Sequence, residues 1–290
     1  MRSNDKQRVI AVIRNALVSN GVDPHDWDGE GLVETPRTVT ETDPTPLADL
    51  ILNKAFPAAP SGAEYWHYTS FAAAHQILKE RTFRLYSVMK RIDEGEFRAF
   101  CDDHHCSGYI QIDPATGQPL FKGLCGDLFY GSFVRVGEGD QEYMWQVFAS
   151  QHCGVRFRLR ITPTLQRAEI RPVVYASQDS RTLVTAIMDA VSSLGGPQFI
   201  LRGISRIAAF YLRFDNSECE TRLLIKRYSG GVNLATDLDG NHEYFPLKVQ
   251  ADHDWCRIDI LGLECGSMMG DTQRSQIDSE WTAFTSARRA

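Results

Sequence analysis

The segment from Val155 to Ile161 constrains the fold more than any other part of this sequence. Apolar and basic side chains alternate along it without a break. The apolar positions are Val155, Phe157, Leu159 and Ile161, and the basic positions are Arg156, Arg158 and Arg160. Because side chains in a strand point alternately to opposite faces, one face of this segment is suited to a core and the other to water. The pattern therefore predicts a half-buried β-strand.

Other strand-like and helix-like segments follow one another irregularly along the chain. The predicted strands are 65–68, 82–88, 128–136, 155–161, 170–176, 218–228, 242–249 and 257–263. The predicted helices of this region are 71–79, 90–106, 142–150, 180–194 and 200–210. The glycine fingerprints of a doubly wound fold are missing from the sequence. We therefore expect an α+β fold with mixed or antiparallel sheets and flanking helices.

The first 60 residues have a different texture. An apolar stripe predicts a helix over residues 3–19, and a short helical pattern recurs at 46–54. Proline interrupts much of the remainder. We expect residues 1–60 to form a helical appendage with a proline-rich linker, and residues 64–290 to form the main α+β domain. The N-terminal helix either packs on the main domain or binds a partner.

Composition and charge exclude some classes of protein. The net charge of −6 argues against a protein that binds nucleic acid through bulk positive charge. The sequence has no apolar leader and no run of about 18 apolar residues, so we expect neither a signal peptide nor a membrane span. Seven scattered cysteines suit a reducing compartment better than a disulfide framework. These features predict a cytoplasmic protein that does not bind a membrane.

Motifs of common enzyme classes are absent from the sequence. It has no G-x-x-x-x-G-K-[ST] of P-loop NTPases, no G-x-S-x-G of α/β-hydrolases and no H-E-x-x-H of zinc proteases. The segment from Cys101 to Cys106 (C-D-D-H-H-C) suggests a metal site, with Cys101 and His105 on one face of a helix. A zinc site commonly takes its ligands from two spaced pairs, and the second pair is missing here. We therefore expect no metal.

The best candidate for a reactive site is the segment Glu218-Cys219-Glu220-Thr221-Arg222. In a strand, Glu218, Glu220 and Arg222 share one face, and the alternate residues are suited to burial. Two carboxylates at this spacing repel each other, and Arg222 offsets part of that repulsion. Such a pair can bind a ribose hydroxyl and stabilise positive charge that develops at an anomeric carbon. The alternative is a solvated strand face with an ordinary Glu–Arg pair.

Two other features carry polar side chains suited to ligands. His67 lies in an aromatic strand, where it can donate a hydrogen bond to a ligand while Trp66 or Tyr68 stacks on a ring. The alternative for His67 is a core-edge histidine with a backbone partner. The arginines of 155–161 form a basic strand face, which either meets a polyanion such as RNA or a dinucleotide pyrophosphate or faces solvent.

Ordered blocks over residues 64–266 resemble a bacterial family catalogued as domain of unknown function 2971. Residues 65–70 (Y-W-H-Y-T-S) resemble its opening strand, and residues 131–155 resemble its central S-F … M-W-x-x-Y-A … H-x-G block. Residues 218–223 match its closing E-x-E-x-R-L motif. The sequence departs from the family pattern at two places: residues 92–96 are I-D-E-G-E where the family shows N-D-P-x-E, and Phe148 stands where the family has the tyrosine that follows M-W.

The layout of these blocks is similar to that of ADP-ribosyltransferases, which pair an early-strand H-Y-x-T/S with a late-strand glutamate. This resemblance implies an enzyme that binds NAD in a cleft between two small sheets. By position, His67 would hold the adenosine-side ribose. Glu220 would bind the nicotinamide-side ribose and stabilise an oxocarbenium-like transition state, and Glu218 would orient the acceptor nucleophile. The other implied NAD-binding residues are Ser132 on the strand that lines the cleft, Arg222, and the candidates for stacking on nicotinamide, Tyr68, Trp145 and Phe148.

The sequence thus gives one leading hypothesis and two alternatives. The leading hypothesis is an NAD-consuming ADP-ribosyltransferase of toxin or phage-defence type that modifies a protein or a nucleic acid. The first alternative is a non-enzymatic module that binds a nucleotide or RNA. The second alternative is a metal-dependent nuclease, and its acidic residues would be Asp93, Glu96, Asp215 and Glu220.

Overall fold

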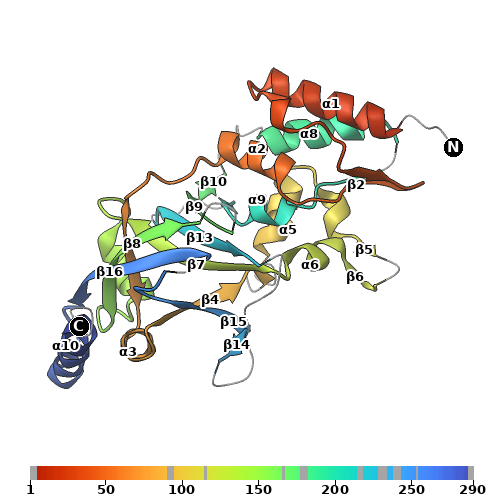
Figure 1. Cartoon of the computed structure of the whole chain (residues 1–290). Coiled ribbons are helices and arrows are strands. Elements are labelled where there is room, and N and C mark those ends of the chain that lie inside the picture. Colours follow the sequence, from red (N-terminus) through yellow and green to blue (C-terminus); the bar gives the residue numbers. More distant parts are fainter. Residues whose placement is uncertain are drawn as a thin grey trace. The chain divides into compact units, whose positions relative to one another are not determined.

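A computed structural model of the chain describes residues 5–89, 95–113, 116–164, 167–176, 182–196, 198–213, 218–227, 234–237, 243–252 and 254–286. The protein combines antiparallel strands with flanking helices (Figure 1). The chain forms two compact units, and each is assembled from three separated stretches. Unit 1 comprises residues 1–57, 88–127 and 173–215, and unit 2 comprises residues 58–87, 128–172 and 216–290.

Unit 2 is built on a sheet of nine described strands, in which every pair of neighbours runs antiparallel. The order along its main path is β14 (Ala235–Thr236), β15 (Glu243–Lys248), β4 (Thr82–Ser87), β7 (Leu128–Arg135), β3 (Glu64–Thr69), β8 (Val155–Pro163) and β16 (Cys256–Cys265). Off this path, β13 (Glu220–Lys226) pairs with β7, and β9 (Ala168–Pro172) pairs with β13.

Two strands, β3 and β4, pair with the same edge of β7. β4 pairs with its first half, where Tyr86 lies opposite Tyr130, and β3 pairs with its last residues, where Trp66 lies opposite Val134. Between these contacts the described ladders leave residues 131–133 without a partner on this edge. Strand β13 pairs with the opposite edge of β7 from end to end. The sheet of unit 2 is therefore continuous on one side of β7 and split on the other.

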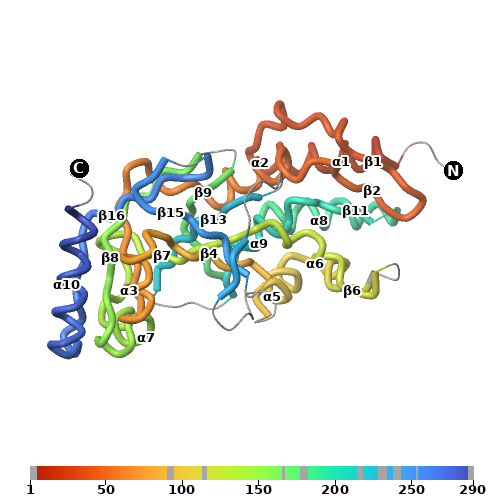
Figure 2. The backbone as a smooth tube through the Cα atoms, turned by 60° about the horizontal axis from the view of Figure 1, so that its bottom comes forward, coloured from red at the N-terminus to blue at the C-terminus, as the bar shows by residue number. Residues whose placement is uncertain are grey.

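The core of unit 2 lies on one face of this sheet. The alternation predicted for 155–161 is confirmed, because the apolar side chains of β8 are buried while Arg158 and Arg160 are exposed. Helix α3 (Phe71–Glu80) connects β3 to β4, and helix α10 (Asp271–Ser286) packs along α3, as both ribbon views show (Figures 1 and 2). On the other face, helix α7 (Gln141–Phe148) packs on β3.

Unit 1 packs helices on a small sheet. Helix α1 (Asp5–Ser19) lies against α8 (Leu183–Ser192) and buries its predicted apolar stripe. The sheet contains β1 (Leu32–Glu34), β2 (Thr38–Glu41) and β11 (Gln198–Ile200), with β11 parallel to β2. Helix α2 (Pro46–Ala55) packs against α8 and α9 (Ile204–Ala208). The other elements are η1 (Pro24–Asp26), α5 (Glu96–Asp103), η2 (Ser107–Ile110), β5 (Ile112–Asp113), β6 (Gln118–Pro119), α6 (Leu120–Cys125), β10 (Val174–Tyr175) and β12 (Tyr211–Leu212).

The expected α+β class with antiparallel strands and flanking helices is confirmed. Two predicted elements are wrong in detail. The strand expected over 170–176 is interrupted, since β9 ends at Pro172 and β10 pairs with β12 in unit 1. A proline has no N–H for the ladder, which favours a strand end there. The helix expected over 200–210 keeps only the five residues of α9.

The assignment of residues to the two units also differs from the domain boundary expected near residue 60. Residues 1–57 supply α1, α2 and β2 to unit 1, where they contact α8 and β11. The contacts therefore group this N-terminal stretch with two later stretches of the chain. The apolar stripe of α1, which the sequence left open to a partner, contacts α8 within unit 1.

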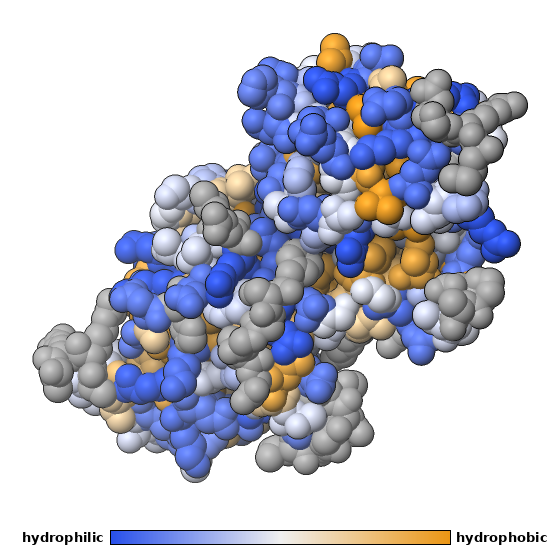
Figure 3. Space-filling view, turned by 45° about the vertical axis from the view of Figure 1, so that its right-hand side comes forward, coloured by the Kyte–Doolittle hydropathy of each residue, from blue (hydrophilic) through white to orange (hydrophobic). Residues whose placement is uncertain are grey.

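On the face that Figure 3 shows, hydrophilic side chains predominate and hydrophobic ones form separate patches. Within the described ranges, we find no helix that combines the length and the apolar character needed to cross a membrane.

Candidate functional site

The split in the sheet of unit 2 opens into a pocket of about 280 Å³. Strands β3 and β4 and helix α3 form its walls, and residues 130–132 of β7 form its floor. The pocket exists because β3 and β4 leave the middle of β7 uncovered on this edge. Small-molecule sites are usually clefts lined by apolar side chains together with a few polar groups that fix the ligand.

His67 lies in this pocket and contacts the uncovered edge of β7. Its Nδ1 is 3.1 Å from the carbonyl oxygen of Ser132, so the ring supplies a hydrogen bond that a neighbouring strand would otherwise make. Burial lowers the pKa of His67, and the Ser132 carbonyl offsets this effect in part. The imidazole is therefore neutral at pH 7, with its proton on Nδ1, and Nε2 is an acceptor for a ligand hydroxyl.

Glu220 lies next to Ser132 on the other side of β7. Its Oε1 accepts hydrogen bonds from the hydroxyl of Ser132 and from Nε of Arg222 at 2.9 Å, and its Oε2 accepts one from Arg222 at 3.0 Å. Glu220 is 3% exposed and Arg222 is 2% exposed. The structure thus brings together three predicted site residues, Glu220, Arg222 and Ser132, as a buried cluster. A solvated strand face, the alternative from sequence, does not describe them.

Ser132 joins two groups that lie on opposite faces of the sheet. Arg222 is opposite Ser132 in the ladder, so the side chains of Ser132, Glu220 and Arg222 share one face. The ring of His67 contacts Phe133 at 5.5 Å between centroids, and Phe133 belongs to the core on the other face. The carbonyl of Ser132 therefore contacts His67, while its hydroxyl contacts Glu220.

Glu218 does not share the strand face of Glu220. Strand β13 begins at Glu220, and Cys219 before it has a left-handed backbone with φ of 47°. Because strand alternation needs extended backbone, the predicted common face of Glu218, Glu220 and Arg222 is wrong at Glu218. Cys219, which the alternation assigned to the buried face, is exposed. Glu218 itself is half-buried.

The predicted aromatic residues gather elsewhere in unit 2. Tyr68 and Trp145 meet edge to face with 5.3 Å between ring centroids. The guanidinium of Arg156 lies 5.7 Å from the ring centroid of Tyr68 and 5.4 Å from that of Trp145. Phe148 is 39% exposed and contacts the ring of Tyr143. None of these rings is among the residues that line the described part of the split pocket.

Arg84, Tyr86 and Tyr130 line the pocket but were not singled out from the sequence. Nε of Arg84 is buried without a hydrogen-bond partner in the part of the chain that the structure describes. The terminal nitrogen of Arg84 contacts Glu80 at 3.2 Å, and its guanidinium lies over the ring of Tyr244. The sequence predicted a strand over 82–88, in which Arg84 stands between the apolar residues Phe83 and Leu85, and this isolated cation was the available signal.

Two carboxylates partly neutralise the three arginines of β8. Arg158 contacts Glu64 at 2.6 Å and Arg160 contacts the same residue at 3.0 Å. Arg156 donates to Glu264 at 2.6 Å. These ion pairs lower the net positive charge of this strand face, so it attracts a polyanion less strongly than the sequence suggests.

The side chains of the Cys101–Cys106 segment point to different partners. Asp103 contacts Arg213 at 2.8 Å, and His105 contacts Asp189 at 2.6 Å. His104 is buried, with Nδ1 3.0 Å from the hydroxyl of Thr185, and burial lowers its pKa to about 4. No group of three or more His, Cys, Asp or Glu side chains placed for a metal ion occurs among the described residues.

The acidic residues of the nuclease alternative are only partly described. Asp93 and Asp215 lie outside the described residues. Glu96 belongs to unit 1 and Glu220 to unit 2. The structure therefore gives no observation in favour of that alternative.

Comparisons of the chain with protein-family models, with curated proteins and with solved structures find no match. The resemblance to domain of unknown function 2971, and through it to ADP-ribosyltransferases, stays a prediction.

Proposed function

We propose that the protein is an NAD-consuming ADP-ribosyltransferase, of toxin or phage-defence type, that binds its nucleotide in the split between β3 and β4. The observation that carries this proposal is the meeting of His67 and Glu220 at Ser132, in the middle of the strand that bridges the split. The acceptor is a protein or a nucleic acid.

The pocket is large enough for one part of the dinucleotide. Its volume of about 280 Å³ is near the lower end of the range of roughly 300–1,000 Å³ for small-molecule sites. It therefore suits a nucleoside-sized moiety, and the rest of NAD would lie along the open mouth. The neutral ring of His67 would accept a hydrogen bond from a ribose hydroxyl, and Nε of Arg84 would donate to the pyrophosphate.

In the proposed reaction, the bond between C1′ of ribose and the nicotinamide nitrogen breaks, and nicotinamide leaves with the electron pair. An acceptor nucleophile forms the new bond to C1′ and releases its proton. The carboxylate of Glu220 would stabilise the positive charge that develops at C1′, while Arg222 and Ser132 hold it in one orientation. Glu220 and the ring of His67 lie on opposite faces of the sheet. The proposal therefore requires the ribose to lie at the uncovered edge of β7 beside Ser132, within reach of the carboxylate.

One observation favours a second candidate, a module that binds a nucleotide without chemistry. Glu220 is buried and both of its oxygens contact Arg222, on the face opposite His67. Such a pair can be purely structural, and the pocket can still bind a nucleotide through His67 and Arg84.

Turnover of labelled NAD in the presence of bacterial lysate tests the proposal. The purified chain should release nicotinamide and label a protein or nucleic-acid fraction. Glu220→Gln should lower release roughly 100-fold or more, the effect of removing one preorganised charge-stabilising group. Arg84→Gln should mainly raise KM for NAD. Glu243→Gln, which changes an exposed carboxylate of the same unit, is the matched control and should leave release unchanged.

The outcomes separate the two candidates. If the folded wild-type chain releases no nicotinamide but binds NAD, and Glu220→Gln binds equally well, the binding module is supported and the transferase is not. If the folded chain neither binds nor consumes NAD, the transferase is contradicted, and so is a binding module whose nucleotide is NAD. Circular dichroism and thermal melting establish that each variant is folded.

A further inference from the structure

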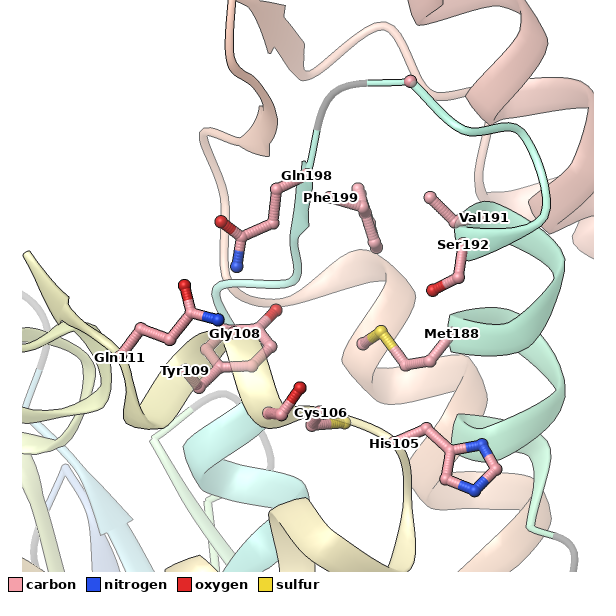
Figure 4. Close-up of a pocket in the computed structure, with 12 residues that line it drawn as sticks. His105, Cys106, Gly108, Tyr109, Gln111, Met188, Val191, Ser192, Gln198 and Phe199 are labelled. Atoms are coloured by element: carbon pink, nitrogen blue, oxygen red, sulfur yellow. The ribbon is translucent and has the colours of Figure 1, made fainter.

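Unit 1 contains a separate pocket of about 370 Å³ (Figure 4). The segment 105–111 forms one side, the last turns of α8 form another, and β11 closes it. All of its lining residues belong to unit 1. Its volume lies within the range of roughly 300–1,000 Å³ for small-molecule sites and accommodates a nucleoside-sized ligand.

The exposed side chains of Gln111, Gln198 and Ser192 line this pocket and have no hydrogen-bond partner among the described residues. The amides of Gln111 and Gln198 converge from two sides of Gly108, and the hydroxyl of Ser192 points into the open space (Figure 4). A Cβ atom at position 108 would lie 2.0 Å from Nε2 of Gln198, so a glycine is needed there for the amide to take this place. The two amides therefore offer donors and acceptors at one end of the pocket.

The opposite wall is apolar. Met188 and Val191 of α8 and Phe199 of β11 form it, as Figure 4 shows. Tyr109 is buried, and its hydroxyl accepts a hydrogen bond from N of Leu201 at 2.6 Å, which holds the ring in place. A flat ring system placed here would contact apolar side chains with its face and the amides with its edge.

The charges around the pocket do not suit an anion. No lysine or arginine is among its described lining residues. Near its rim, Nδ1 of His105 and Oδ1 of Asp189 are 2.6 Å apart. A phosphate group would therefore gain no direct cationic partner from the lining, whereas a neutral ligand does not need one.

From these observations we propose that this pocket is a binding site for adenine, as the free base or as the nucleoside. A glutamine side chain can donate to N7 and accept from the N6 amino group of adenine, which is the pairing that glutamine makes with this base elsewhere. The apolar wall receives the face of the purine, and the hydroxyl of Ser192 is available to a ribose. The site lies in unit 1 and does not rest on the NAD chemistry proposed for unit 2.

Calorimetric titration of the full chain with adenosine, adenine, AMP, uridine and NAD tests this inference. Adenosine and adenine should bind, uridine should bind much more weakly, and AMP should bind no more tightly than adenosine. One of the variants Gln111→Leu and Gln198→Leu should weaken adenosine binding roughly 5- to 150-fold, the range for losing one bidentate base contact, and the other should weaken it less. Ser192→Phe, at an exposed position, should block the pocket.

Gln118→Leu is the matched control, since Gln118 is exposed in the same unit and does not line the pocket. It should bind adenosine as the wild type does, and none of these variants should change nicotinamide release if the chain shows that activity. The inference is overturned if wild-type protein does not bind adenosine or adenine. It is also overturned if Gln111→Leu, Gln198→Leu and Ser192→Phe all bind normally, or if AMP binds far more tightly than adenosine.

Discussion

At the scale of single residues, the described part of the chain buries several charged side chains against partners of opposite charge. Arg206 is fully buried and contacts Asp49 at 2.7 Å, and Arg171 is buried against Glu169 at 3.0 Å. Burial of an ion costs several kcal/mol unless a partner and hydrogen bonds compensate, so such pairs specify one arrangement more than they stabilise it. Glu220 with Arg222 belongs to the same pattern, which is why its role needs the activity measurement described above.

Glu41 is a buried carboxyl group whose charge state depends on pH near neutrality. It is 3% exposed, and burial raises its pKa to about 8, although the backbone N–H of Arg202 at 3.1 Å offsets part of the effect. Between about pH 4.5 and 8 the unfolded chain has lost this proton while the folded chain keeps it. The contribution of Glu41 to stability is therefore fully present below about pH 4.5 and is lost as the pH rises through 8.

We expect Glu41→Gln to abolish this dependence, because glutamine keeps the acceptor for N of Arg202 and does not ionise. Relative to the variant, the wild type should lose up to a few kcal/mol of unfolding free energy between pH 5 and 8, since one pKa unit corresponds to about 1.4 kcal/mol. Urea denaturation at a series of pH values measures the difference. Parallel curves for the two proteins would contradict the prediction.

At the scale of elements, the decisive feature is the way that β3 and β4 share one edge of β7. The two strands are joined by only one short helix, α3, and that helix lines the split pocket with one side and contacts α10 with another. His75 of α3 contacts Glu280 of α10 at 2.6 Å, and Arg81 donates to the carbonyl of Phe284 at 3.0 Å. Helix α10 therefore supports the wall of the candidate site from behind.

Phe284 tests how strongly α10 supports this wall. Its ring is 2% exposed, belongs to the core of unit 2 and lies under the guanidinium of Arg81 at 4.8 Å. Phe284→Ala should lower the unfolding free energy by about 3–5 kcal/mol, because it removes a large buried ring and leaves a cavity. Met268→Ala, at a residue that is 69% exposed, is the control and should change it by less than about 0.5 kcal/mol. Chemical denaturation measures the change in unfolding free energy for each variant. Equal changes for the two variants would refute a supporting role for α10.

At the scale of the whole molecule, neither compact unit corresponds to a continuous part of the chain. Unit 1 depends on residues 1–57, since α1 covers α8 and β2 pairs with β11. The residues of α8 that are buried in the complete chain include Val184, Ile187 and Val191. Removal of residues 1–57 would expose these apolar side chains of α8 to water.

We therefore expect a chain that lacks residues 1–57 to aggregate or to lose the cooperative unfolding of unit 1. A domain that begins near residue 60 would instead remain monomeric and keep its thermal transition. Gel filtration, binding of a hydrophobic dye and thermal melting distinguish the two results. A monomeric, unchanged shortened chain would show that residues 1–57 are a true appendage.

Local pattern alone determined the class of fold and most of its elements. The alternation in β8, the strand–helix–strand from β3 to β4 and the helix over 5–19 depend on neighbouring residues, whose periodicity is visible in any sequence. The same kind of argument brought forward His67, Glu220 and Arg222, and the family resemblance added Ser132. The structure places these four residues around one strand.

Only the tertiary structure decided where these groups face and what they contact. The split of the sheet, the burial of Glu220 and the place of Arg84 in the pocket arise from pairings between segments far apart in the chain. A left-handed residue such as Cys219 shifts the register of faces, and no periodicity signals it. The grouping of residues 1–57 with 88–127 and 173–215 has the same origin, because burial is a property of the assembled core and not of a local segment.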